Sequence, residues 1–245
     1  MDMTGLAVEA RGWTRRRSTA ASASGGPRAS ASPLARAGFT LAIGLALVAC
    51  ALILGADRAW SKPPVRILML GDSIAAGYGL PEAESLPRAL QAALRAAGHD
   101  VEVMDGGVSG DTTAGGLARA GWMLAAKPQI VIVELGANDG LRGLDPKASY
   151  ANLDRLLGIL ESAKLAVLLT GMLAPPNLGR EYGQEFAAIY PALAEKHHCL
   201  LYPFLLQGVA AIAELNQADG IHPNAKGVAV IARGLAPYVE KLLGG

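Results

Sequence analysis

Short runs of aliphatic residues alternate along the chain with longer stretches in which apolar positions recur at helical spacing. The aliphatic runs predict buried strands at residues 65–70, 101–104, 129–135, 165–170 and 199–204. The spaced stretches predict helices at residues 83–97, 113–125, 148–163, 184–195 and 225–243. Strands that alternate with helices imply right-handed crossovers and a parallel sheet covered on both faces. We therefore predict an α/β fold with three layers, α/β/α, around a mainly five-stranded parallel sheet.

The first 61 residues have a different pattern from the rest of the chain. Residues 1–36 are rich in Ala, Ser, Gly and Arg, and they hold too few large apolar side chains to offset the entropy of ordering. We expect this region to be disordered. Residues 38–56 are an uncharged run of 19 residues, about the length that crosses a bilayer as a helix. We therefore divide the chain into a disordered region (1–36), a signal peptide or membrane anchor (37–61) and one folded domain (62–245).

The charges around the apolar run predict export. Arg28 and Arg36 precede it, so the positive-inside bias puts the N-terminus in the cytoplasm and the domain in the periplasm or cell envelope. Small residues at Ala59 and Ser61 allow cleavage before Lys62, whereas an uncut segment would tether the domain to the inner membrane. A lipoprotein box ending at Cys50 and a twin-arginine signal at residues 15–17 fit the pattern less well.

Composition excludes some classes of partner. The chain of 245 residues is 51% hydrophobic and 18% charged, which suits a globular domain with an apolar segment. Residues 62–245 carry fifteen Lys and Arg against eighteen Asp and Glu, with no basic stripe of the kind that nucleic acid requires. The two cysteines, Cys50 and Cys199, indicate no disulfide framework.

The first predicted strand ends in Gly71-Asp72-Ser73. This pattern is typical of a tight turn that presents a hydroxyl at the edge of a sheet, which makes Ser73 the candidate nucleophile. Taken alone, Asp and Ser at a strand-to-helix turn most often cap the next helix. The polar residues after the other strands decide between these interpretations.

Three further loops carry polar groups that suit acyl transfer. The Gly110 turn can direct backbone N–H groups at an anion, and the side-chain amide of Asn138 can donate hydrogen bonds. Asp219 and His222 share one loop, so the carboxylate could orient the imidazole. Taken singly, these are an ordinary loop, an Asn turn and a surface histidine. Because ligands bind at the carboxyl ends of parallel strands, we expect the loops to meet there.

These loops resemble, in order, the four sequence blocks of the SGNH hydrolases, also called the GDSL family. The resemblance runs from about Val65 to the C-terminus and favours the bacterial periplasmic acyl-CoA thioesterase, arylesterase and lysophospholipase branch. The matching stretches are Gly71-Asp72-Ser73, Ser109-Gly110-Asp111-Thr112, Gly116-Leu117-Ala118-Arg119, Glu134-Leu135-Gly136, Asn138-Asp139-Gly140-Leu141-Arg142-Gly143 and Asp219-Gly220-Ile221-His222-Pro223-Asn224.

The resemblance implies a flavodoxin-like fold and a role for each candidate residue. Ser73 would be the nucleophile, and His222 the base paired with Asp219. The oxyanion donors would be the Ser73 N–H, the Gly110 N–H and the Asn138 side chain. A serine hydroxyl needs such a base, and the charge that develops on the carbonyl oxygen needs fixed donors. No cofactor is required.

Other polar residues receive lesser roles. Asp72 competes with Asp219 as the acid of the triad, but as the neighbour of Ser73 we expect it to fix the turn. We expect Glu134 to be a buried, hydrogen-bonded structural acid. The sequence His197-His198-Cys199 is compatible with a metal site, but no second ligand cluster accompanies it, so we predict no metal.

We predict a serine esterase that hydrolyses carboxylic esters or thioesters through an acyl-serine intermediate. Gly140 and Leu141, in a glycine-flanked loop, and Leu173 and Pro175, after the fourth strand, are the candidate substrate-binding residues. Aryl esters, acyl-CoA and lysophospholipids are the expected substrates. A carbohydrate O-acetyl esterase and a non-catalytic lipid- or carbohydrate-binding module are the alternatives.

Overall fold

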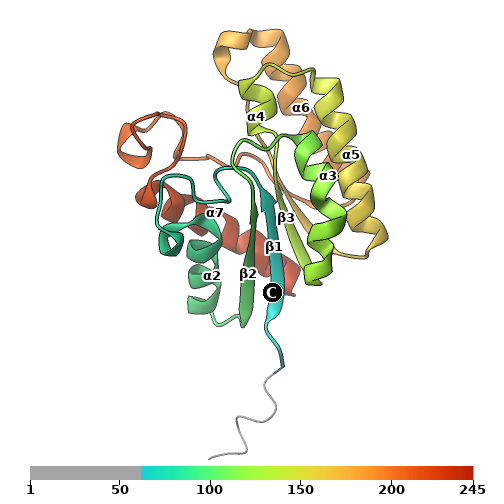
Figure 1. The fold of residues 1–245 in the computed structure, drawn as a ribbon, viewed down its shortest axis with the longest axis vertical. Helices are drawn as coiled ribbons and strands as arrows, with labels where there is room; N and C mark the ends of the chain where they lie inside the picture. The colour runs from blue at the N-terminus through green and yellow to red at the C-terminus, as the bar shows by residue number, and fades with distance from the viewer. Residues whose placement is uncertain (1–61, 245) are drawn as a thin grey trace, which may run out of the picture. The chain divides into compact units, whose positions relative to one another are not determined.

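A five-stranded parallel sheet forms the centre of the domain in the computed structural model, which describes residues 62–244 (Figure 1). The strand order is β2-β1-β3-β4-β5, and every neighbouring pair is parallel. The strands are β1 (Val65–Gly71), β2 (Val101–Gly107), β3 (Ile130–Glu134), β4 (Ala166–Thr170) and β5 (Leu200–Tyr202). The predicted parallel sheet of five strands is confirmed.

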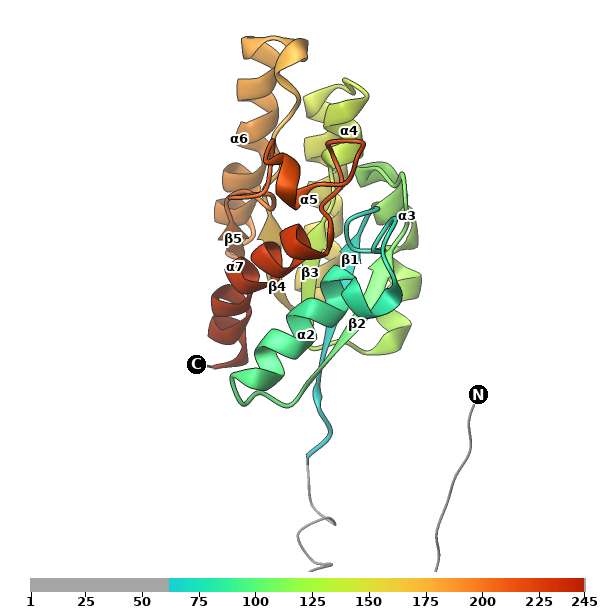
Figure 2. The same cartoon turned by 90° about the vertical axis from the view of Figure 1, so that its left-hand side faces the viewer.

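Helices cover both faces of the sheet. On one face α2 (Leu86–Ala96) packs against α7 (Ala225–Leu243). On the other face α5 (Pro146–Ser162) lies between α3 (Thr113–Met123) and α6 (Arg180–Lys196). Figure 2, turned by 90°, shows α2 and α7 together in front of the strands. This is the predicted three-layer α/β/α arrangement.

The central strands read as continuous aliphatic runs because both of their faces are buried. All five residues of β3 are buried, as are the last five of β1. The helices instead bury one stripe, which in α2 consists of Leu86, Pro87, Leu90 and Leu94. These two patterns explain why the strands and helices could be told apart in the sequence.

The strand ends differ from the prediction in a way that matters for the site. β2 continues past Met104 to Gly107, because it stays paired with β1 to the end: Gly71 pairs with Gly107 on one side and with Glu134 of β3 on the other. The carboxyl ends of β1, β2 and β3 are therefore level. The short helix α4 (Ala137–Leu141), directly after β3, was not predicted.

The predicted disordered region (1–36) and the predicted signal peptide or anchor (37–61) lie outside the described residues. Within residues 62–244, no helix is both long enough and apolar enough to cross a membrane.

Candidate active site

Ser73 lies in the turn that follows β1, and buried hydrogen bonds hold this turn on both sides. The carboxylate of Asp72 accepts the Ile74 N–H through Oδ1 at 3.1 Å. Oε2 of Glu134 accepts the N–H groups of Asp72, at 3.0 Å, and Ala75, at 3.3 Å. Asp72 and Glu134 are fully buried, whereas Ser73 is 9% exposed and faces the cavity described below. The turn thus presents one hydroxyl from a fixed backbone.

His222 connects Ser73 to Asp219. Its Nε2 lies 2.9 Å from the Ser73 Oγ, and its Nδ1 lies 2.7 Å from Oδ2 of Asp219. The other carboxylate oxygen of Asp219 accepts the backbone N–H groups of Ile221 and His222, both at 3.0 Å. Because an ionised carboxylate only accepts, Nδ1 carries the hydrogen of the neutral imidazole, and Nε2 is free to accept the Ser73 hydroxyl.

The surroundings of Asp219 favour its charged form. The backbone N–H of His222, and then its ring, donate to the carboxylate and lower the pKa of Asp219 to about 2. The Tyr78 ring also lies against the imidazole, with 4.6 Å between ring centroids. The imidazole is therefore fixed on both sides, by the carboxylate and by an aromatic ring.

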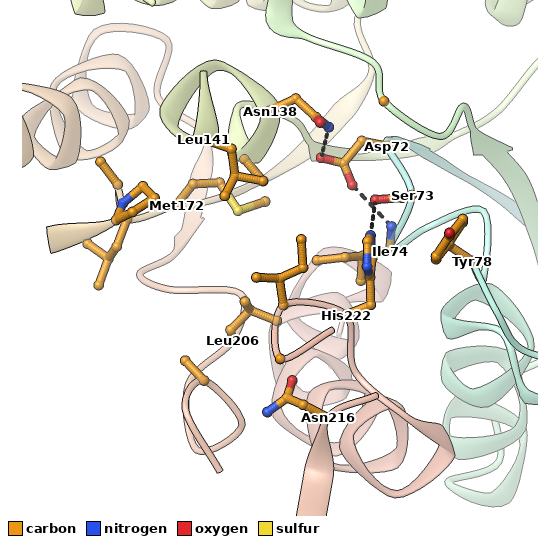
Figure 3. Close-up of a pocket in the computed structure, with 18 of the residues that line it drawn as sticks. Asp72, Ser73, Ile74, Tyr78, Asn138, Leu141, Met172, Leu206, Asn216 and His222 are labelled. Atoms are coloured by element: carbon orange, nitrogen blue, oxygen red, sulfur yellow. Dashed lines mark hydrogen bonds between the residues drawn. The ribbon is translucent and has the colours of Figure 1, made fainter. Parts of the chain in front are cut away.

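Three residues that line the cavity, Ser73 itself, Gly110 and Asn138, carry hydrogen-bond donors. In the described part of the chain, neither the Ser73 N–H nor the Gly110 N–H donates to any protein group. The Asn138 amide donates one hydrogen to Oδ2 of Asp72 at 3.1 Å, which leaves its second hydrogen unassigned (Figure 3). Ser73, Gly110 and Asn138 all line one cavity. Donors in this arrangement can stabilise a developing oxyanion.

The cavity has a volume of about 520 Å³ and an apolar wall. Figure 3 shows Leu141, Met172 and Leu206 on the side of the cavity away from Tyr78. The cavity is also lined by Leu173, Pro175, Phe204 and Ile221. Among the described residues, Asp72 is the only Asp, Glu, Lys or Arg that lines it. A pocket of this size and polarity suits an apolar group attached to the reacting carbonyl.

The sequence-predicted residues do not all meet at this cavity. Leu141, Leu173 and Pro175 line it, but Gly140 does not: it is buried in α4, where a Cβ would come within 3.4 Å of Phe186 and Ala174. The ring of His197 lies between Asp154, at 2.8 Å, and Glu161, at 3.1 Å, away from the cavity. Asp72 makes no hydrogen bond to the His222 ring nitrogens, which bond Ser73 and Asp219, and it bonds the turn and Asn138 instead.

Two side chains that sequence reasoning left without a role organise the loops. Arg119 of α3 donates to Oδ2 of Asp111 and to the carbonyls of Gly106 and Gly71, each at 2.7 Å. It therefore joins the end of β1 to the loop that carries Gly110. The only earlier sign of it was its place in one of the family-like stretches.

Asp139 is the second of these side chains. It is buried beside Asn138 in α4, and it accepts the N–H and the hydroxyl of Thr113 at the start of α3 and the hydroxyl of Ser149 in α5. These bonds fix the helix that carries Asn138 to two neighbouring helices. In the sequence, Asp139 stood out only as part of one of the family-like stretches.

The chain is similar to known esterases over most of the described domain. A sequence model of the "GDSL-like Lipase/Acylhydrolase family" matches residues 69–230. An arylesterase from Vibrio mimicus is 40% identical over 184 residues, which are 75% of this chain and 92% of the relative.

Two further relatives agree with this match. "Thioesterase 1/protease 1/lysophospholipase L1" from Escherichia coli (strain K12) is 36% identical over 178 residues, 72% of this chain and 84% of the relative. The crystal structure of AlinE4, an SGNH-hydrolase family esterase, is 46% identical, with a TM-score of 0.64, and covers 75% of this chain and 99% of its own.

Proposed function

The chain belongs to the GDSL-like lipase/acylhydrolase family, the SGNH hydrolases, and we propose from this that Ser73, His222 and Asp219 form its catalytic triad. The family resemblance in the sequence is thus confirmed, and the chain is a serine hydrolase acting on esters or thioesters. The observation that carries the proposed triad is the continuous connection from the Ser73 Oγ through the imidazole to the Asp219 carboxylate.

The positions of these groups support the following reaction. The Ser73 oxygen attacks the carbonyl carbon while its proton moves to Nε2 of His222. The Ser73 N–H, the Gly110 N–H and the Asn138 amide bind the resulting oxyanion. Collapse expels the alcohol or thiol, which takes the proton from Nε2, and leaves an acyl-serine. His222 then removes a proton from water, which attacks the acyl carbon. The bond between that carbon and the Ser73 oxygen breaks, Nε2 returns the proton to this oxygen, and the acid is released.

Substitution of Ser73 tests the nucleophile. We expect Ser73→Ala to abolish hydrolysis of p-nitrophenyl esters and to prevent labelling by a fluorophosphonate, without loss of the folded state. Ser109→Ala is the matched control, because this serine lines the same cavity but makes no hydrogen bond to His222. It should keep the label. Retained turnover in Ser73→Ala, or a label on another residue, would refute the proposed nucleophile.

The apolar wall supports a substrate with an acyl chain, such as an aryl ester, an acyl-CoA or a lysophospholipid. Leu141, Leu173 and Pro175 would contact this chain. Turnover of p-nitrophenyl esters from acetate to laurate, compared with acetylated sugars, tests this. We expect kcat/KM to rise beyond acetate, because a longer chain buries more apolar surface. A preference for acetylated sugars would favour the carbohydrate O-acetyl esterase instead.

For the N-terminal part we propose that residues 38–56 direct the domain across the inner membrane. The support is the uncharged run behind Arg28 and Arg36. Expression of the full chain in a Gram-negative host, followed by N-terminal sequencing, separates two forms: a mature protein starting at Lys62, or an uncut protein in the membrane fraction. An uncut protein in the cytoplasmic fraction would contradict export.

A further inference from the structure

Glu134, the last residue of β3, bonds the turn of Ser73 through one carboxyl oxygen. Its Oε2 accepts the N–H groups of Asp72 and Ala75, which lie on either side of the serine. Residue 71 is glycine, and a Cβ there would clash with Oε2 and with the Cβ of Ala75. The side chain is fully buried and takes no part in the reaction described above.

The other oxygen of Glu134 accepts no hydrogen bond. Oε1 is buried, and no N–H or hydroxyl group of residues 62–244 donates to it. The Glu134 side chain also lies within hydrogen-bonding reach of the Asp72 carboxyl group, and a bond between two carboxyl groups needs a proton on one of them. A buried carboxylate oxygen without a donor destabilises the fold, because a charged group loses favourable hydration free energy on burial and nothing here replaces it. A neutral carboxyl group avoids much of this cost when its proton resides on the oxygen that accepts nothing. The pattern of bonds at Glu134, two on Oε2 and none on Oε1, fits that form.

A second buried carboxyl group lies next to Glu134. Asp72 is also fully buried, and no Lys or Arg of the described domain forms an ion pair with either side chain. Two adjacent buried carboxylates, neither of them paired with a cation, cannot both be ionised at low cost. Asp72 is the better holder of the charge, because each of its oxygens accepts an N–H, from Ile74 and from Asn138. Burial first, and then the charge of Asp72, raise the pKa of Glu134 well above its ordinary value.

We propose that Glu134 is a neutral carboxylic acid and a positioning residue, which holds the turn of Ser73 while a single negative charge stays on Asp72. That one charge orients the Asn138 amide. A second charge at Glu134 would make the electrostatic potential at the site more negative, and this would oppose formation of the oxyanion. This positioning role rests on the proposed function, in which Ser73 is the nucleophile. The protonation state of Glu134 does not depend on the role of Ser73.

Carboxyl ¹³C NMR of the protein labelled at glutamate side chains tests the protonation directly. We expect one glutamate signal in the range of a neutral acid at pH 7, absent in Glu134→Gln. Glu102→Gln is the matched control, since Glu102 lies in the same sheet but is partly exposed and paired with Arg66. Glu134 is the only buried glutamate in residues 62–244, so the wild-type spectrum is informative even if Glu134→Gln does not fold. A spectrum with only ionised glutamates overturns the proposal.

Activity separates positioning from simple filling of space. Glu134→Gln keeps an acceptor for the two N–H groups and is neutral, so kcat should stay within about threefold of wild type. Glu134→Ala leaves those N–H groups without an acceptor and should lower kcat by about 10²-fold with little change in KM. Equal loss in both variants, or full activity in Glu134→Ala, would refute the role. Active Ser73→Ala would refute the nucleophile instead, and would leave the NMR result standing.

Discussion

The site of Ser73 contains acidic side chains in two regions, and the two regions shift the carboxyl pKa in opposite directions. Asp219 lies on a loop, with its side chain 38% exposed, and donors from His222 lower its pKa to about 2. Asp72 and Glu134 lie under the serine turn, fully buried, and burial raises the pKa of both. The exposed region, Asp219 and His222, favours a charged carboxyl group. The buried region, Asp72 and Glu134, tolerates only one charge between its two carboxyl groups.

The difference assigns separate tasks to the two regions. In the proposed mechanism, a charge at Asp219 stabilises the imidazolium that forms when His222 takes the serine proton. The buried pair has no contact with that proton, but its oxygens hold Ile74, Ala75 and the Asn138 amide in place. The proposed mechanism thus assigns proton transfer to Asp219 and His222, and the position of the attacking serine to Asp72 and Glu134.

Loss of the charge in the exposed region should have the largest effect. In Asp219→Asn the oxygen can still accept the backbone N–H groups, but the amide cannot accept a hydrogen from Nδ1, so the imidazole is held in the wrong tautomer. We expect kcat for p-nitrophenyl butyrate to fall by about 10³–10⁴-fold. Asp100→Asn, at an exposed aspartate, is the control. A loss below tenfold would mean that Asp219 is not the partner of the base.

A smaller loss is expected where the buried region presents its donor. Asn138→Ala removes the amide that Asp72 orients, and should lower kcat by about 10²–10³-fold with little change in KM, because the oxyanion exists only in the transition state. Asn177→Ala, at an exposed position of the turn Pro176–Leu178, should behave as wild type. An increase in KM alone would instead make Asn138 a group that binds the ground state.

The exposed region was also the easier one to find in the sequence. Asp219 and His222 are three residues apart in one loop, so their contact needed no knowledge of the fold. The rule that parallel strands end at the same edge placed Ser73 and Asn138 near one point, and the family resemblance supplied their roles. Long aliphatic strands such as β3 were visible for a similar reason, since burial on both faces leaves a continuous run.

The buried region could be derived only in part. The sequence predicted that Asp72 would fix the turn and that Glu134 would be a buried structural acid, as the structure shows, but not the side chains that surround them. Arg119 bonds Gly71 across 48 positions, and Thr113 contacts Asp139 across 26, so only the folded packing brings them together. The five residues of α4 are too few to show helical spacing, and the end of β2 is hidden by Asp105, Gly106 and Gly107, which are not aliphatic. The polar frame beneath the site is thus a property of tertiary structure.

The opposite pKa shifts predict opposite dependences of stability on pH, the smallest of these effects. Asp219 has a lowered pKa in the folded state, so its contribution is present above the unfolded pKa, about 4, and is lost as the pH falls towards about 2. Glu134 has a raised pKa, so its contribution is present below about pH 4 and is lost as the pH rises through the folded value.

Urea unfolding of the wild type, Asp219→Asn and Glu134→Gln at several pH values separates these two contributions. The free energy of unfolding of the wild type should exceed that of Asp219→Asn above about pH 4, and this difference should disappear as the pH falls. The difference should be less than about 1 kcal/mol, because water screens an exposed carboxylate. As the pH rises above about 4, the free energy of unfolding of Glu134→Gln should increase relative to that of the wild type, because the amide has no proton to lose. Free-energy differences that do not change with pH would show that the two regions do not differ in charge, whatever their burial.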